Sequence, residues 1–294
     1  MSDPIFKVNV AEWVEKAKDD PVAYQQRQTV EITLNAIART APLRGKMFLK
    51  GGILMGLAYD SPRQTADIDL TTALEAEGSV GDEVRKLLDS EFPRAAAELG
   101  YADLIVKTHS VKHLPKGKFP NANFPALKLK IASAKRRTPQ ERALRGGQAS
   151  DVMIDVDISF NEPLPQIHVL KLTGGQELHA YGLADLIAEK FRAMLQQVPR
   201  HRNRPQDVYD FDRLIARNEI DDERQAQILD ALVEKCQARR IKPLRSSLDD
   251  PEIKRRAGAA WRSMELELGE VPDFEGCFTR VAEFYRNLPR QRRN

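Results

Sequence analysis

The stretch KGGILMGLAYDSPRQTADIDL, residues 50–70, predicts more about this chain than any other segment. Apolar residues 47–49 before it are typical of a short strand, and the apolar residues after Gly52 recur at helical spacing. Gly51 and Gly52 therefore lie where a strand passes into a helix. Because glycine has no Cβ, its backbone N–H group can come close to a bound anion. The N-terminus of the following helix adds partial positive charge at the same place.

The second half of the stretch places Asp67 and Asp69 on either side of Ile68, preceded by Arg63 and Thr65. Side chains in a strand alternate between its two faces, so we expect both carboxylates on one face. Carboxylate oxygens and substrate phosphates are the ligands that suit Mg²⁺. Together with the glycines, this pattern predicts a site for a nucleoside triphosphate and a divalent metal. The alternative is a polar surface strand after an ordinary glycine turn, since short motifs often occur by chance.

A third acid is offered by residues 152–160, in which apolar and polar residues alternate strictly. We predict a strand with Asp155, Asp157 and Ser159 on one face. Placed beside the strand of Asp67 and Asp69, it would complete a carboxylate cluster that holds metal at an in-line displacement. A solvent-facing polar edge explains the same alternation equally well.

A helix is predicted over residues 181–197, and Lys190 lies off much of its apolar stripe. A lysine ammonium is a compact charge suited to phosphate. Asp207 and Asp210 are three residues apart on a second predicted helix and share one face. Solvated surface charges are the alternative for all three.

The motifs together resemble the nucleotidyltransferase superfamily and, more closely, the AbiEii/AbiGii toxin family of bacterial abortive-infection and toxin–antitoxin systems. The matching segments follow the family's order along the chain: Leu49 to Gly52, Arg63 to Leu70, Asp157 to Glu162, Leu186 to Ala193, and Asp207 to Phe211. Five motifs in order are far more specific than any one of them.

The resemblance implies roles position by position. The nucleotide-binding residues it implies are Lys50, Gly51, Gly52, Arg63, Thr65 and Lys190. Mg²⁺ or Mn²⁺ would be held by Asp67, Asp69 and Asp157, with Asp155 as a competing third acid. Lys190 and Asp207 would complete the catalytic set. One position departs from the family, because Gln206 replaces a basic residue that Arg204 or Arg202 could supply.

Composition favours a cytoplasmic protein. The chain has 294 residues and a net charge of +3. No apolar run approaches the length of about 18 residues that a membrane helix needs, and the N-terminus lacks the regions of a signal peptide. Cys236 and Cys277 are the only cysteines, and we expect them to be reduced and structural.

Positive charge is concentrated in three segments, 128–145, 239–256 and 286–293. Basic clusters attract the phosphate backbone of nucleic acid, although charge runs are more often simply solvated. With the resemblance, they point to an RNA acceptor.

We predict an α/β (α+β) fold with a mixed, mostly antiparallel sheet and a C-terminal helical bundle. The expected divisions are a helical segment 1–45, a nucleotidyltransferase domain 46–175 and a helical domain 176–294. After the strands of residues 46–172, no further strand is expected. Helices are expected at 10–40 and 78–99, and at 181–197, 206–217, 221–239, 250–268 and 273–288.

The function this implies is a metal-dependent nucleotidyltransferase toxin. It would transfer a nucleoside monophosphate from an NTP to an RNA end, with tRNA as the favoured acceptor, and be restrained by a cognate antitoxin. A small-molecule or protein hydroxyl is an alternative acceptor. A nucleotide- or RNA-binding module without transfer activity is the alternative outside enzymes.

Overall fold

A computed structural model describes residues 5–63, 65–164 and 166–290. Its contacts divide the chain into two units. The first contains residues 1–60, 65–162 and 167–180, and the second contains residues 61–64, 163–166 and 181–294. Residues 1–45 therefore belong to the same unit as the sheet. The short segments 61–64 and 163–166 belong to the second unit although the first unit surrounds them in the sequence.

The first unit is built on one eight-stranded mixed sheet with the order β1-β7-β8-β2-β3-β6-β5-β4. The strands are β1 (Ile5–Lys7), β2 (Met47–Lys50), β3 (Ile68–Thr72), β4 (Leu104–Leu114), β5 (Ala126–Lys135), β6 (Val152–Phe160), β7 (Ile167–Lys171) and β8 (Glu177–Tyr181). Strand β3 pairs antiparallel with β2 and parallel with β6. β6 pairs antiparallel with β5, and β5 with β4. This sheet is mixed as expected, and the long pairs of β4 with β5 and β5 with β6 make it mostly antiparallel, although β1 with β7 and β2 with β8 are also parallel.

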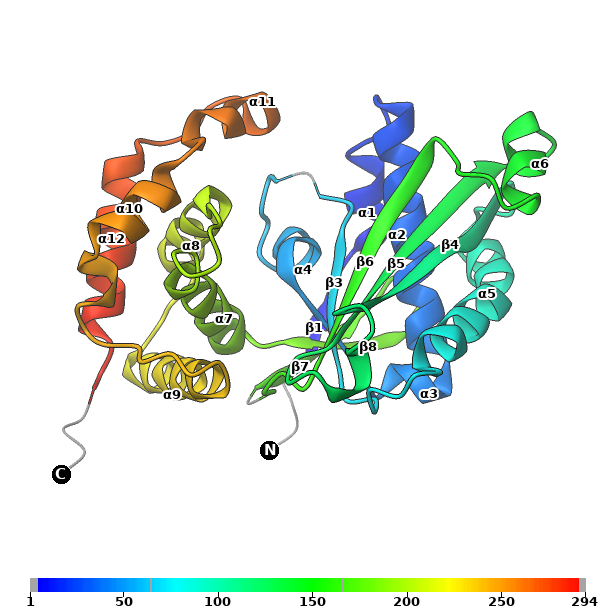
Figure 1. The fold of residues 1–294 in the computed structure, drawn as a ribbon. Coiled ribbons are helices and arrows are strands. Elements are labelled where there is room, and N and C mark those ends of the chain that lie inside the picture. Colours follow the sequence, from blue (N-terminus) through cyan, green and yellow to red (C-terminus); the bar gives the residue numbers. More distant parts are fainter. Residues whose placement is uncertain (1–4, 64, 165, 291–294) are drawn as a thin grey trace. The chain divides into compact units, whose positions relative to one another are not determined.

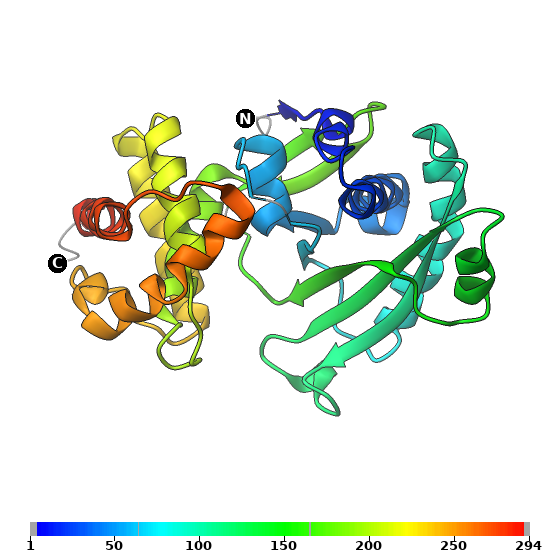
Figure 2. The same cartoon turned by 90° about the horizontal axis from the view of Figure 1, so that it is seen from above.

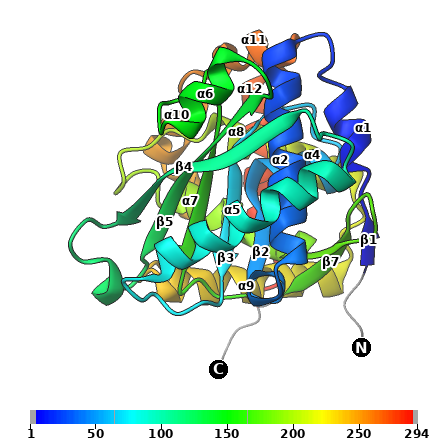
Figure 3. The ribbon, with the colours of Figure 1, turned by 90° about the vertical axis from the view of Figure 1, so that its right-hand side faces the viewer.

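Helices α2 (Pro21–Arg39) and α5 (Val80–Glu98) cover one face of the sheet in Figure 3. Helix α2 contacts β5, β6 and α5, and α5 contacts β4. Strict alternation along β6 buries its apolar residues and leaves Asp155, Asp157 and Ser159 only partly exposed, on the other face. The apolar core therefore fixes which residues of β3, β5 and β6 form the polar face.

The remaining helices of this unit are short. They are α1 (Val10–Glu15), α3 (Ala41–Arg44), α4 (Gly51–Ala58), η1 (Phe119–Asn121) and α6 (Pro139–Arg145). The side chain of Asp20 caps α2 by accepting hydrogen bonds from Val22 N and Ala23 N. This cap explains why the helical pattern of residues 10–40 is divided into two helices.

The second unit is helical (Figures 1 and 2). Its elements are α7 (Leu183–Leu195), α8 (Pro205–Arg217), α9 (Asp222–Ala238), η2 (Ser247–Asp249), α10 (Pro251–Gly258), η3 (Trp261–Met264), α11 (Glu265–Leu268) and α12 (Phe274–Asn287). Phe191 of α7 packs against Phe211 of α8, with ring centroids 4.0 Å apart, and against Tyr285 of α12 at 4.9 Å. These rings join three helices into one apolar core.

Further sequence expectations differ from the structure. Strand β8 lies in the region where no strand was expected. It is a short strand between β7, which precedes it across a tight turn, and its parallel partner β2, more than 120 residues earlier in the chain. The helix expected at 250–268 is divided where Ala260 adopts a left-handed backbone, with φ of 61°. Asp67 immediately precedes β3 instead of lying within it.

Among the described residues, no helix combines the length and apolarity that crossing a membrane requires. Cys236 and Cys277 are both buried and reduced.

Candidate active site

The glycine junction lies between β2 and α4. Gly51 has a left-handed φ of 72°, which an L side chain adopts only with strain. A Cβ at this position would lie 2.1 Å from Asp69 Oδ2, and one at Gly52 would lie 2.7 Å from Thr65 Cγ2. The glycine pair is therefore needed twice, for the backbone turn and for the close approach of Asp69 and Thr65.

Four charged residues form a row across the polar face of the sheet. In the strand register, Lys50 of β2 is opposite Asp69 of β3, Asp69 is beside Asp157 of β6, and Asp157 is opposite Lys128 of β5. Side chains at paired positions share a face. Lys50 is buried, and its Nζ donates to Ser159 Oγ at 3.3 Å. The predicted neighbourhood of Asp69 and Asp157 is thus produced by parallel pairing of strands more than 80 residues apart in sequence.

Two lysines of β5 bind the acids of β6. Lys128 Nζ lies 3.2 Å from Asp155 Oδ2 and 3.5 Å from Asp157 Oδ2, and Lys130 Nζ lies 3.0 Å from Asp155 Oδ1. Partial desolvation of Asp155 is outweighed by the hydrogen bonds from both lysines, which hold its pKa below the usual value. Asp155 is the more fully neutralised acid, whereas Asp157 is directly beside Asp69. This register favours Asp157 as the third acid.

Asp67 completes the predicted set from the segment before β3. Its backbone N–H donates to Thr65 Oγ1 at 3.3 Å, and its side chain is exposed. Desolvation by neighbouring groups raises the pKa of Asp67, and the charge of Asp155 raises it further while Lys128 lowers it. A carboxylate in such surroundings gains from a nearby cation, which favours its charged form.

The donor chemistry of Asp67, Asp69 and Asp157 fits Mg²⁺ or Mn²⁺, because all three offer carboxylate oxygen. In the part of the chain that the structure describes, no three His, Cys, Asp or Glu side chains are arranged as a ready cation cage. The ammonium of Lys128 forms ion pairs with Asp157 and Asp155. The residues fit the metal by the chemistry of their oxygens and, for Asp69 and Asp157, by strand register.

A second charged group lies within the helical unit. Lys190 of α7 is buried, with Nζ 2.8 Å from Asp210 Oδ2 and 3.3 Å from Asp207 Oδ1 on α8. Arg63 Nη1 lies 2.7 Å from the same Asp210 oxygen. Burial of the Lys190 ammonium is outweighed by Asp210 and Asp207, which raise its pKa above the ordinary value. Lys190 is therefore not the solvated surface lysine of the alternative interpretation.

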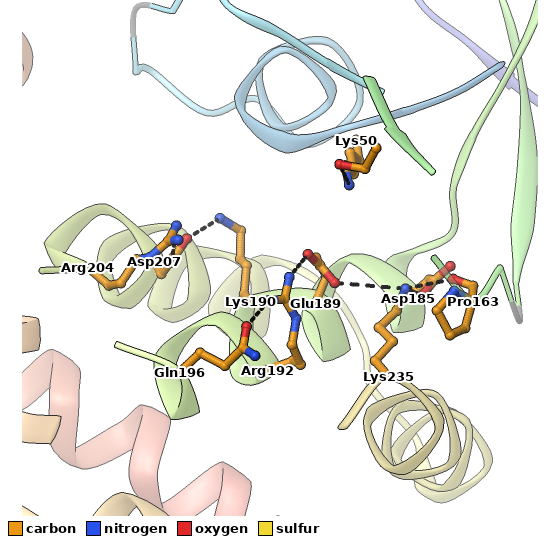
Figure 4. A network of polar contacts seen from close by, with 11 residues as sticks. Lys50, Pro163, Asp185, Glu189, Lys190, Arg192, Gln196, Arg204, Asp207 and Lys235 are labelled. Atoms are coloured by element: carbon orange, nitrogen blue, oxygen red, sulfur yellow. Dashed lines mark hydrogen bonds and ion pairs between the residues drawn. The ribbon is translucent and has the colours of Figure 1, made fainter. Parts of the chain in front are cut away.

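Asp210 is the residue that sequence reasoning underestimated. It is fully buried and contacts both Lys190 and Arg63, whereas Asp207 is partly exposed and also lies 3.5 Å from Arg204 Nη1. Figure 4 shows Lys190 directed toward Asp207 and Arg204. The three-residue spacing of Asp207 and Asp210 was the available signal. Arg204 does approach this pair, as the departure at Gln206 suggested.

A separate buried network joins α7 to α9. Lys235 Nζ lies 2.7 Å from Asp185 Oδ1 and 4.0 Å from Glu189 Oε2, and donates to Pro163 O at 3.0 Å (Figure 4). Glu189 in turn pairs with Arg192. Desolvation raises the pKa of Asp185 to about 6, although Lys235 opposes this shift. The network fixes helix packing and the segment that contains Pro163.

This shift predicts a pH dependence of stability. The pKa of Asp185 is higher in the folded state than the ordinary value of about 3.9, so folding favours the protonated acid. Its stabilisation is complete below about pH 4 and is lost as the pH rises through about 6, by about 3 kcal/mol in total. Urea unfolding at several pH values will measure the free energy of unfolding of both proteins. As the pH rises through about 6, that of wild type should fall relative to that of Asp185→Asn. A pH-independent difference between the two proteins would exclude the assigned shift.

Several residues of the basic segments are paired with acids. Lys128 and Lys130 contact β6, and the later clusters contribute Lys254 with Glu275 and Arg286 with Asp249.

A different basic cluster surrounds the turn between α7 and α8. Desolvation lowers the pKa of Arg200, and the charges that lower it further all belong to arginines: Arg239, Arg192, Arg202 and Arg204. Two of these arginines have acidic partners, since Arg192 pairs with Glu189 and Arg204 Nη1 lies 3.5 Å from Asp207 Oδ2. Sequence reasoning named Arg202 and Arg204 but did not predict their gathering with Arg192 and Arg239.

The comparisons with known proteins agree with this geometry. The sequence profile of the family described as nucleotidyl transferase AbiEii toxin, type IV toxin–antitoxin system, matches residues 33–280. The structure is similar to the MenT4 nucleotidyltransferase toxin from Mycobacterium tuberculosis, with a TM-score of 0.50 and 15% sequence identity, covering 95% of this chain and 98% of that one. No curated protein matches the sequence significantly.

The mixed sheet, the glycine junction and the acids of β3 and β6 define a nucleotidyltransferase fold. By its match over residues 33–280, the chain belongs to the AbiEii family of nucleotidyltransferase toxins of type IV toxin–antitoxin systems.

Proposed function

We propose that this toxin transfers a nucleoside monophosphate from an NTP to the end of an RNA, with Mg²⁺ or Mn²⁺ held by Asp67, Asp69 and Asp157. The observation that carries the proposal is the pairing of Asp69 with Asp157 beside Gly51. Two carboxylates and a glycine-lined helix start are what a metal-bound triphosphate requires.

The chemistry follows from these residues. The backbone N–H groups of Gly51 and Gly52 hold phosphate oxygens, and Lys50 maintains the strand end from which they project. Asp157 accepts the proton of the attacking hydroxyl. The bound cation supplies positive charge to the reacting phosphate and the leaving pyrophosphate.

The helical unit contributes positive charge. Lys190 and Arg63 share Asp210 as their partner, and we assign to this pair the neutralisation of substrate phosphates. Asp207 keeps Lys190 oriented. The family resemblance implies roles for Lys190, Arg63 and Asp207. The ion pairs of the first two lead us to add Asp210, their shared partner.

An RNA acceptor is supported by the arginines around Arg200. An RNA strand offers successive phosphates to such a cluster, and its binding should weaken steeply with salt. A tRNA end is the acceptor we favour. A cognate antitoxin and a cytoplasmic location, where NTPs and RNA occur, complete the proposal.

The decisive experiment incubates purified protein with each labelled NTP, Mg²⁺ or Mn²⁺ and total cellular RNA. We expect label in RNA, lost on chelation of the metal, and sequencing or mass spectrometry of the product will locate it. Absence of transfer with every NTP and both metals would contradict the proposal. Label in protein or in a small molecule would instead support the alternative acceptors.

A further inference from the structure

Lys128 lies on the polar face of the sheet in contact with Asp157, one of the acids proposed to bind metal. Its ammonium spans Asp155 and Asp157, at 3.2 Å and 3.5 Å. A lysine ammonium is cationic at neutral pH, because its ordinary pKa is about 10.4. A fixed positive charge thus lies against Asp157, which is paired in register with Asp69.

We propose that Lys128 is the resident counterion of Asp157, that a divalent cation displaces it, and that it thereby sets the cation concentration the enzyme needs. This inference rests on the proposed metal site. Without a cation, Asp69 of β3 and Asp155 and Asp157 of β6 would repel one another, and the ammonium of Lys128 relieves that repulsion.

The contact is suited to displacement. The side chains of Lys128 and Asp157 are 36% and 46% exposed, and exposed ion pairs contribute little to stability. A dication on the same carboxylates gains more than a single ammonium does. Lys128 can then swing away while retaining solvent contact, since its stem is long and flexible.

Lys130 provides a matched comparison. It is on the same strand and the same face, two residues further on, and it pairs with Asp155 at 3.0 Å. Its partner is not the acid beside Asp69. Lys128→Gln and Lys130→Gln each remove one positive charge. A difference in Mn²⁺ affinity between them therefore reports on the contact with Asp157.

The first test measures Mn²⁺ binding by calorimetry, without nucleotide. We expect Lys128→Gln to bind Mn²⁺ about tenfold more tightly than wild type, as removal of one nearby charge predicts. Lys130→Gln should change the affinity by less than about threefold, and Lys128→Arg should stay close to wild type. Unchanged or weaker binding by Lys128→Gln, or equal tightening by Lys130→Gln, would overturn the inference.

The second test follows the lysine itself in the wild-type protein. Acetic anhydride labelling with peptide mass spectrometry should show Lys128 becoming several-fold more reactive on Mn²⁺ addition as its ion pairs break. Lys130 should change little. Constant labelling of Lys128 at saturating Mn²⁺ would show that no displacement occurs.

Failure of this inference can be distinguished from failure of the proposed function. If wild type binds Mn²⁺ and Asp157→Asn does not, the metal site stands, and an unchanged Lys128→Gln affinity rejects only the role of Lys128. If neither wild type nor Lys128→Gln binds Mn²⁺, the metal site and the role of Lys128 are both wrong.

Discussion

Replacing Asp69 by asparagine is expected to reduce nucleotide transfer by about 10³-fold, the scale seen when one electrostatic group of a transition state is removed. Asparagine has nearly the same shape, so it fits beside Gly51, where Asp69 Oδ2 already occupies the place of a Cβ. What is lost is the negative charge that, with Asp157, attracts the cation. Transfer of labelled nucleotide, with Mn²⁺ affinity measured on the same protein, will check this.

The matched control is Asp103→Asn, an exposed acid in the turn before β4 of the same unit. It should retain wild-type transfer and metal affinity. Circular dichroism should show both variants folded. Substantial transfer by Asp69→Asn would remove the proposed metal site, whereas loss of transfer by Asp103→Asn as well would indicate a general effect of charge.

Replacing Asp210 by alanine is expected to destabilise the helical unit by about 3 kcal/mol, because it leaves the buried ammonium of Lys190 without its nearest partner. Asp210 also holds Arg63, so two positive groups lose one shared carboxylate. Asp207, at 3.3 Å from Lys190, compensates only in part.

Fluorescence can isolate this unit. The chain has two tryptophans, and Trp261 belongs to the helical unit, so denaturation in a Trp13→Phe background reports on that unit. Asp230→Ala, an exposed acid on α9, is the control and should stay within about 0.5 kcal/mol of its parent. Adding Lys190→Met to Asp210→Ala should recover part of the loss, because the unpaired charge is removed. No recovery would mean that Asp210 stabilises the unit other than through Lys190.

Local sequence predicts most elements of this fold. The alternation in residues 152–160 fixes both the strand and the face of Asp155 and Asp157, since apolar side chains must be buried. Periodicity likewise predicts α7 and α8 within a few residues. Strand β8 was missed because it is only five residues long and one of its two neighbours, β2, is distant in the chain.

The sequence by itself determined the glycine junction, the alternation that directs the acids to one face, and the family resemblance. These features depend only on residue type and on the spacing of neighbouring residues. Backbone sterics then fix the glycine turn, and burial of the apolar side chains fixes the face of the acids. Only the tertiary structure decided that Lys128 contacts Asp157, that Asp210 is buried between Lys190 and Arg63, and that arginines gather around Arg200. Each of these contacts joins residues on different strands, helices or loops, so strand register and helix packing determine them, and neither can be read from one segment alone.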